Sequence, residues 1–306
     1  MRKATGESEK CSGAAKAIGQ KAYDALIEEV ITTPKPGLVD LYSNGAHTDM
    51  DAGTFRRSAE ALYPFFISMA QTGIEKKGTE EELFRGLRKT GMEAEKAMYA
   101  ATGGVNTHKG IIFTFGIFCA AAGRLVQKDK ALTPANLLTM QQKMSVRVLT
   151  QELEAMRDMD FAAGADGRRA LTHGEQNLRC YGTFGIRGEA VAGYPGVFRI
   201  GLPVLREGIR QGRDWNLVKL QTLLTLMSRT EDSNVLSRGG MEELRRVQTE
   251  MEAFLAAGGA YRPDAERLLK AMDADYILRN CSPGGSADLL AAVILIHSLG
   301  NLPTFS

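Results

Sequence analysis

Cysteine is scarce in this sequence, which holds four cysteines in 306 residues, none of them in a Cys-x-x-Cys pair. Isolated thiols argue against both a zinc site and a disulfide framework, and they are typical of proteins of the reducing cytoplasm. We therefore expect a cytoplasmic protein that folds without disulfides. The four residues are Cys11, Cys119, Cys180 and Cys281.

A strong net charge is also lacking, because 38 lysines and arginines face 36 aspartates and glutamates, for a formal charge of +2. So small an excess does not attract nucleic acid, DNA included, or a membrane surface, and an anionic ligand must be held by locally placed cations. The longest apolar runs, residues 111–123 and 289–299, are shorter than the roughly 20 residues of a membrane span and are expected as buried helices. We expect a small-molecule partner, and the sequence leaves formation of a homo-oligomer open.

No proline- and serine-rich linker or low-complexity stretch marks a point at which two cores could separate. The 44% share of hydrophobic residues is enough to bury one sizeable core. The first ten residues are polar and lack the apolar segment of a secretory signal. We expect a disordered tail over residues 1–12 and a single catalytic domain over residues 13–306.

Strand-like alternation is absent, whereas apolar residues recur at helical spacing, as in Leu217, Leu220 and Leu224. Capping signals agree, because residues 79–82 and 172–175 fit the capping box and Thr133 precedes a proline that suits a first helical position. The prediction is an all-α fold, one globular domain of roughly ten helices. The expected helices cover residues 13–32, 51–71, 79–102, 110–126, 133–160, 172–181, 187–211, 214–229, 240–257, 264–279 and 286–299.

Glycine is abundant, at 33 residues, and much of it lies in short polar strings between the predicted helices. A glycine-rich turn before a helix lets backbone N–H groups approach a phosphate, and the helix N-terminus adds a favourable partial charge. We expect the active site to be formed by these glycine-rich interhelical loops, although helix termination explains any single string equally well. The strings cover residues 33–40, 44–51, 103–110, 185–190, 231–240 and 282–288.

Cations within the strings predict a phosphate site. Lys109 supplies a point charge, and Arg187 and Arg238 supply forked donors that suit phosphate oxygens. Together they could hold a polyphosphate, although no Walker motif occurs. The string around Ser286 is expected to be an anion cradle with that serine as N-cap, since no G-x-S-x-G elbow indicates a nucleophile. The other predicted phosphate ligands are Asn106, Gly104, Gly239, Ser282, Gly284 and Gly285.

Carboxylates in the same strings indicate a hard cation, because carboxylate oxygens favour Mg²⁺ shared with a triphosphate over zinc. Asp40, Asp49 and Asp232 are the predicted metal ligands, the last two because they lie among other polar groups. Asp51 and Asp288 also suit the first turn of a helix, where a carboxylate complements the helix dipole. For Asp51 we favour that structural role.

Two of the four histidines, His47 and His108, have polar neighbours. Each could supply a general acid, a phosphate donor or only a satisfied loop hydrogen bond. His297 lies in an apolar run and is expected in the core or at the surface.

Taken in order, the strings resemble the triphosphoribosyl-dephospho-coenzyme A synthase family, which prepares the prosthetic group of citrate lyase and, in related members, of malonate decarboxylase. The resemblance runs from Tyr23 to Leu299, and it departs from the family pattern at Glu231 and Ser233, where aspartate and threonine are usual, and at Cys281, where an aliphatic residue is usual. The first departure leaves the site chemistry intact but puts Glu231 in doubt as a ligand. The most specific pieces are residues 33–40, 44–51, 104–110, 187–190 and 282–290.

The resemblance implies a transferase in which the 2′-hydroxyl of 3′-dephospho-coenzyme A attacks the anomeric carbon of the ribose of ATP and displaces adenine. By analogy with other glycosyl transfers, one carboxylate stabilises the positive charge on the ribose and another takes the hydroxyl proton, and Asp232 and Glu189 are expected in these roles. Mg²⁺ and the three cations would hold the triphosphate. His108 or His47 is available to protonate the departing adenine.

Two other functions stay open. With water as the acceptor, the same site would make an ADP-ribosyl-type N-glycohydrolase, which releases free triphosphoribose. A nucleotide-binding protein without chemistry would bind ATP and release no adenine. The sequence does not decide whether citrate lyase or malonate decarboxylase would receive the product.

Overall fold

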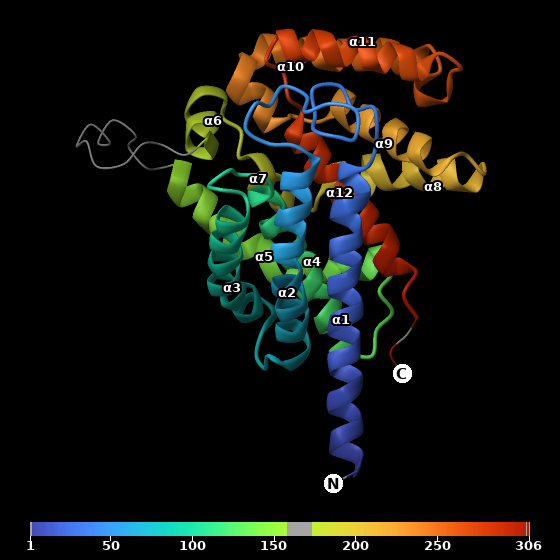
Figure 1. The fold of residues 1–306 in the computed structure, drawn as a ribbon. Helices are drawn as coiled ribbons and strands as arrows, with labels where there is room; N and C mark the ends of the chain where they lie inside the picture. Colours follow the sequence, from blue (N-terminus) through green and yellow to red (C-terminus); the bar gives the residue numbers. More distant parts are fainter. Residues whose placement is uncertain (1, 158–172, 304, 306) are drawn as a thin grey trace.

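The computed structural model describes residues 2–157, 173–303 and 305, and in this part of the chain every regular element is helical, so the predicted all-α fold is confirmed. Figure 1 shows the helices wrapped around α4 and α12, with α11 lying across one end. The elements are α1 (Arg2–Val30), α2 (Ala52–Glu75), α3 (Glu80–Ala101), α4 (Lys109–Gln127), α5 (Pro134–Arg157), α6 (His173–Tyr181), α7 (Gly185–Val191), the π-helical turn η2 (Gly196–Gly201), α8 (Leu202–Arg210), α9 (Trp215–Arg229), α10 (Ser233–Ala256), the 3-10 turn η3 (Gly259–Tyr261), α11 (Ala265–Leu278) and α12 (Gly284–Gly300).

Local capping signals set the first turns of several helices. The Thr79 side chain accepts from the N–H of Glu82, whose carboxylate accepts from the N–H of Thr79, which is the predicted capping box of α3. Asp51 and Thr54 make the same reciprocal pair at the start of α2, which confirms the structural role favoured for Asp51. The other predicted capping box begins at residue 172, outside the described residues.

One predicted helix, residues 187–211, is divided into α7, the π-helical turn η2 and α8. The division falls at Gly193 and Tyr194, which have left-handed φ angles of 78° and 51°. Pro195 follows directly, and a proline disfavours the α conformation in the residue before it. A continuous helix therefore cannot pass this point.

Two helices, α10 and α1, begin earlier in the sequence than predicted. The helix α10 begins at Ser233 rather than at residue 240, and it bends at Gly240, whose φ is 70°. The helix α1 begins at Arg2, so the segment expected as a disordered tail is helical in the structure. In Figure 1 the N-terminal part of α1 projects beyond the other helices.

The apolar helix α4 lies in the core, in contact with α1, α2, α3, α5 and α12. By length and composition it could cross a membrane, but 78% of its most apolar window is buried inside the protein, as in the core helix of a globular fold. Glycines let α2 approach it closely. A Cβ on Gly73 would lie 2.2 Å from the carbonyl oxygen of Ala120, and a Cβ on Gly123 would lie 2.1 Å from that of Ala70.

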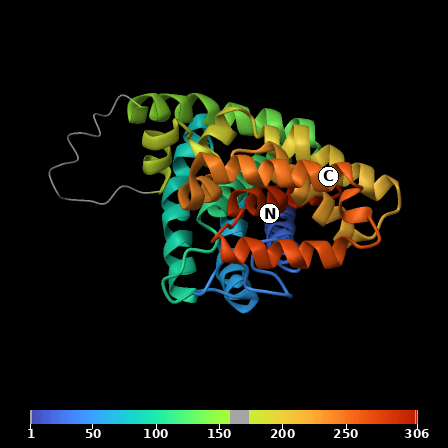
Figure 2. The same cartoon turned by 90° about the horizontal axis from the view of Figure 1, so that it is seen from above.

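The connection between α1 and α2, residues 31–51, contains no helix and lies at the end of the molecule where α12 begins. Figures 1 and 2 show this connection beside α11 and above the ends of α1 and α2. Asp273 of α11 holds it, because its carboxylate accepts from the N–H of Gly37 at 2.9 Å and from the Ser43 hydroxyl at 2.7 Å. The first turns of α4, α10 and α12 meet close to this connection.

Candidate active site

Asp232 joins the first turns of α10 and α12 from a buried position. As the N-cap of α10 it accepts from the N–H groups of Asn234 and Val235, at 2.9 and 3.2 Å. The same carboxylate accepts from the N–H of Gly285 at 3.2 Å, and from the N–H and the hydroxyl of Ser286 at 2.6 and 2.9 Å. Asp232 therefore takes the capping role that the sequence suggested for Ser286.

Five donors occupy the Asp232 carboxylate, which offers about four lone-pair positions on its two oxygens. A metal ion would have to displace these backbone bonds, so the geometry argues against the predicted metal-ligand role. Burial raises the pKa of Asp232, and the hydrogen bonds from Ser286 and α10 oppose that rise. The residue is well placed to order two helix ends.

Gly284 and Gly285 allow the close approach of α12 to α10. A Cβ on Gly284 would lie 2.2 Å from Nδ2 of Asn234, and a Cβ on Gly285 would lie 3.0 Å from Oδ1 of Asp232. Packing alone therefore explains why both positions lack a side chain. Their predicted part in a phosphate cradle remains a prediction.

Asp288 of α12 faces the first turn of α4. A Cβ on Gly110 would lie 2.3 Å from Oδ2 of Asp288, so the glycine makes room for this carboxylate. Burial, followed by the negative charges of Glu29 and Asp232, raises the pKa of Asp288 well above its ordinary value. These three acidic side chains, Glu29, Asp232 and Asp288, are called the carboxylate group below.

A buried lysine lies against this group. Lys35 is 1% exposed, and its Nζ donates to Oε1 of Glu29 at 2.5 Å and to the Glu29 carbonyl at 2.7 Å. The N–H of Lys35 donates to Asp40 at 2.7 Å, and the other oxygen of Asp40 accepts from the N–H groups of Tyr42 and Ser43. Asp40 thus closes its own loop, and these contacts leave the predicted metal role without support.

Sequence reasoning did not select Glu29, Lys35 or Asp288 as site residues. Glu29 and Lys35 lie at the end of one predicted helix and in the following string, so only their burial in the fold reveals the pair. Asp288 was recognised as a first-turn carboxylate. A first-turn position does not reveal whether a carboxylate caps its own helix or faces another one.

His108 lies at the start of α4 with a side chain that is 3% exposed. Its Nδ1 is 2.7 Å from the Ser58 hydroxyl, which itself accepts from the Thr107 hydroxyl, and its Nε2 is buried without a partner in the described part of the chain. Burial, together with the charge of Lys35, lowers the pKa of His108 to about 3. The imidazole is therefore neutral at neutral pH, which argues against the predicted role as an imidazolium acid.

His47 belongs to a second polar group, with Ser282, Arg238 and Asp49. Its Nε2 is 2.9 Å from the Ser282 hydroxyl and its Nδ1 is 3.3 Å from Nη2 of Arg238. Because a guanidinium only donates, Nδ1 accepts and the proton lies on Nε2, which donates to Ser282. This arrangement does not activate Ser282 as a nucleophile. Burial and the charge of Arg238 lower the pKa of His47, whereas Asp49, whose Oδ1 is 3.8 Å from Nδ1, opposes the shift.

The three predicted phosphate cations engage different neighbours. Lys109 pairs with Glu95 of α3 at 2.7 Å. Arg187 contacts Met156 of α5, and Arg238 donates to Asn280 at 2.7 Å. All three side chains are exposed. Their convergence on one triphosphate remains a prediction.

Glu189 of α7 accepts from the N–H of Gly196 at 2.6 Å through Oε1. Burial raises the pKa of this carboxylate. A side chain on Gly196 would meet both Glu189 and Leu289 of α12, so Glu189 lies close to the helix that carries Asp288.

The remaining predicted phosphate ligands have local structural roles. Asn106 accepts from the N–H of Lys109 at 3.2 Å and so caps α4. Gly104 follows the end of α3 with a φ of 92°, and its N–H donates to the carbonyl of Tyr99 at 2.8 Å. A side chain on Gly239, inside α10, would meet Glu243.

Metal binding by protein side chains alone finds no support, because in the described residues no group of three or more histidine, cysteine, aspartate or glutamate side chains is arranged so that it could hold a metal ion. Of the predicted ligands only Asp49 keeps an exposed carboxylate, with its side chain 59% exposed. The residues therefore do not form a cage for a resident metal ion. Mg²⁺ bound to a triphosphate needs only one or two protein carboxylates, so Mg²⁺ as a part of the nucleotide substrate remains a prediction.

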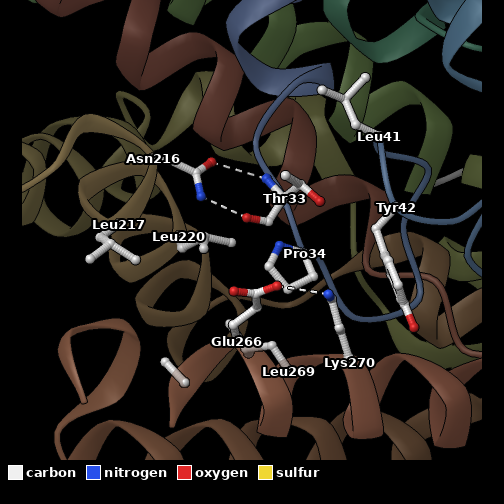
Figure 3. A pocket seen from close by; sticks show the side chains of 11 residues that line it. Thr33, Pro34, Leu41, Tyr42, Asn216, Leu217, Leu220, Glu266, Leu269 and Lys270 are labelled. Atoms are coloured by element: carbon white, nitrogen blue, oxygen red, sulfur yellow. Dashed lines mark hydrogen bonds and ion pairs between the residues drawn. The ribbon is translucent and has the colours of Figure 1, made fainter. Parts of the chain in front are cut away.

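A pocket of about 370 Å³ lies between the residue 31–51 connection, α9 and α11. Figure 3 shows Asn216 bound to the backbone of Thr33 on one wall, and Glu266 paired with Lys270 on the other. None of the predicted catalytic or phosphate residues lines this pocket. The predicted catalytic and phosphate residues therefore lie outside this pocket.

Comparison with known proteins gives one consistent result. A sequence model described as ATP:dephospho-CoA triphosphoribosyl transferase matches residues 15–304. A protein of Pectobacterium atrosepticum, named 2-(5''-triphosphoribosyl)-3'-dephosphocoenzyme-A synthase, is 40% identical over 281 residues, which cover 92% of this chain and 88% of the relative. A protein of Vibrio cholerae has the same name with the prefix "Probable". It is 41% identical over 286 residues, which cover 93% of this chain and 88% of the relative. No solved structure matches the chain.

Proposed function

The chain belongs to the ATP:dephospho-CoA triphosphoribosyl transferase family and is a transferase, and we propose that it moves the triphosphoribosyl group of ATP to the 2′-hydroxyl of 3′-dephospho-coenzyme A with release of adenine. The product would be 2′-(5″-triphosphoribosyl)-3′-dephospho-coenzyme A. We further propose that this product is the precursor of the prosthetic group on the acyl carrier subunit of citrate lyase or malonate decarboxylase.

The observation that carries the proposal is the meeting of three helix N-termini around the carboxylate group. Helix N-termini attract polyphosphates through their positive partial charge and their N–H groups. A ribose that loses adenine develops positive charge, which nearby carboxylates stabilise. The site therefore offers opposite charges to the two ends of the triphosphoribosyl group.

The carboxylates would have different tasks, because their surroundings differ. Asp232 orders the first turns of α10 and α12, on which the nucleotide would lie. Glu189 holds Gly196 through one oxygen, and we assign its second oxygen to the charge that develops on the ribose. Arg238, held by His47 and Asn280, is assigned to the triphosphate. Mg²⁺ enters with ATP as part of the substrate.

The test is incubation of the protein with ATP, Mg²⁺ and 3′-dephospho-coenzyme A, followed by chromatography for adenine and mass spectrometry of the product. We expect one adenine per adduct, which is heavier than the acceptor by one triphosphoribosyl unit. A control acceptor that lacks the 2′-hydroxyl should give no adduct. Free triphosphoribose would instead identify a glycohydrolase, and ATP binding without adenine release would identify a non-catalytic nucleotide-binding protein.

A further inference from the structure

The acidic side chains around the three helix N-termini differ in what holds them. Asp232 accepts five hydrogen bonds, Asp40 accepts three, and Glu29 is paired with Lys35. In the described part of the chain Asp288 makes no hydrogen bond or ion pair, and only its burial and neighbouring charges perturb it. A carboxylate without donors keeps its lone pairs free for a proton.

The carboxylate of Asp288 lies directly against the first turn of α4. A single methyl group on Gly110 would come within 2.3 Å of Oδ2 of Asp288, so the absence of a side chain there leaves room for the carboxylate. Gly110 directly follows Lys109 at the start of α4, where the helix N-terminus attracts phosphate. An acceptor hydroxyl that attacks a nucleotide held at this helix end would therefore lie close to Asp288.

We propose that Asp288 is the base that takes the proton of the attacking 2′-hydroxyl, an inference that rests on the proposed function. The hydroxyl proton moves to a carboxylate oxygen of Asp288 while the hydroxyl oxygen forms a bond to the anomeric carbon of the ribose. The bond from that carbon to N9 of adenine breaks, and its electron pair leaves with adenine. Adenine takes a proton from solvent, and Asp288 returns its proton to solvent, so the reaction is balanced.

The electrostatics suit a base. The charges that face Asp288 come from Glu29 of α1 and Asp232 at the start of α10, both negative, and Lys35 beside Glu29 is already paired. Burial and these two charges raise the pKa of Asp288, and a base works best when its pKa lies near the working pH. Asp232, with its donors, lacks the free oxygens that the task requires.

The decisive variant is Asp288→Asn, which keeps the shape and removes the base. We expect kcat to fall by about 10²- to 10⁴-fold, the usual contribution of a general base, with little change in the KM for ATP. The wild-type rate should fall as the pH is lowered through the pKa of Asp288, and the variant should lose this acidic limb. Unchanged turnover in Asp288→Asn would overturn the proposal.

Stability gives a second readout that separates this role from a structural one. The folded protein holds the proton of Asp288 more tightly than the unfolded chain does, because its pKa is raised on folding. At pH values above the pKa that Asp288 has in the unfolded chain, ionised Asp288 therefore destabilises the fold. This destabilisation disappears as the pH falls to that pKa. We expect Asp288→Asn to melt at a higher temperature than wild type at pH 8, with the difference closing near pH 4. A lower melting temperature at pH 8 would show that the carboxylate is structural.

Two further measurements complete the test. If Asp288 instead binds Mg²⁺, Asp288→Asn will raise the Mg²⁺ concentration needed for half-maximal rate and excess Mg²⁺ will restore kcat, which would overturn the proposal. Gly110→Ala crowds the same carboxylate without removing it, and it should lower kcat even if Asp288→Asn does not fold. A wild-type protein that releases no adenine with dephospho-coenzyme A would disprove the proposed function rather than the assignment of Asp288.

Discussion

At the scale of single residues, the number of donors around a carboxylate separates structural from chemical roles. Asp232 is the buried N-cap of α10 and Asp288 is a half-buried acid near the start of α12, and both have raised pKa values. Asp232 is bound by groups of two helices, whereas the Asp288 side chain accepts no hydrogen bond in the described part of the chain and lies beside Gly110. Both are aspartates near the start of a helix, and only the fold shows that donors surround one carboxylate and not the other.

Replacement of Asp232 should therefore act first on stability. In Asp232→Ala, α10 loses its cap and the N–H of Ser286 loses its acceptor. Each lost cap costs about 0.5–2 kcal/mol, so we expect a loss of roughly 1–4 kcal/mol. Urea unfolding followed by circular dichroism measures the change. The exposed N-cap Asp214 of α9 offers a matched control, since Asp214→Ala removes one cap only. An equal loss in the two variants would contradict the double role of Asp232.

At the scale of helices, close backbone contacts depend on particular glycines. Gly123→Ala would place a methyl group 2.1 Å from the carbonyl oxygen of Ala70 and force α2 and α4 apart. Overpacking of this kind costs about 1–3 kcal/mol. Gly91 of α3 has nothing within 4 Å of its Cβ position. Gly91→Ala should therefore stabilise the protein by about 0.5–1 kcal/mol through helix propensity. Urea unfolding of both variants measures the change in the free energy of unfolding, which should fall in Gly123→Ala and rise in Gly91→Ala. A change in the same direction in both variants would show that the contact at Gly123 does not control packing.

Most of this helical architecture follows from local signals. The capping box of α3 and the proline that opens α5 lie within a few residues of the helix ends that they set. The break at Gly193-Tyr194-Pro195 also has a local signal, which the apolar periodicity of residues 187–211 concealed. The early start of α10 has a local signal too, since Asp232 caps it through the N–H groups of Asn234 and Val235, but its bonds to α12 could not be read from the sequence. The helix boundaries thus follow from local signals, whereas the contacts between helix ends do not.

At the scale of the whole molecule, the site unites segments that are far apart in the sequence. The sequence indicated the strings that contribute to it, including residues 44–51, 231–240 and 282–288, but not which side chains would face one another. His47, Arg238 and Ser282 do come together. Lys109 and Arg187 engage α3 and α5 instead, because the direction of an exposed side chain depends on its neighbours in space. Composition cannot supply this information.

A ligand that binds helix ends from distant parts of the chain should stabilise the whole fold. Any ligand specific for the folded state raises stability by about 2.7 kcal/mol at a hundred times its Kd. We expect inorganic triphosphate with Mg²⁺ to raise the melting temperature by several degrees, and adenosine to raise it less, because the helix N-termini attract phosphate. Arg238→Ala should reduce the shift with triphosphate. Arg267→Ala is the matched control, because Arg267 lies exposed on α11 and, in the part of the chain that the structure describes, pairs with Asp264 alone. If both variants keep the full rise in melting temperature, the triphosphate does not bind at Arg238. The contact between the N-terminal ends of α10 and α12 would then serve packing alone.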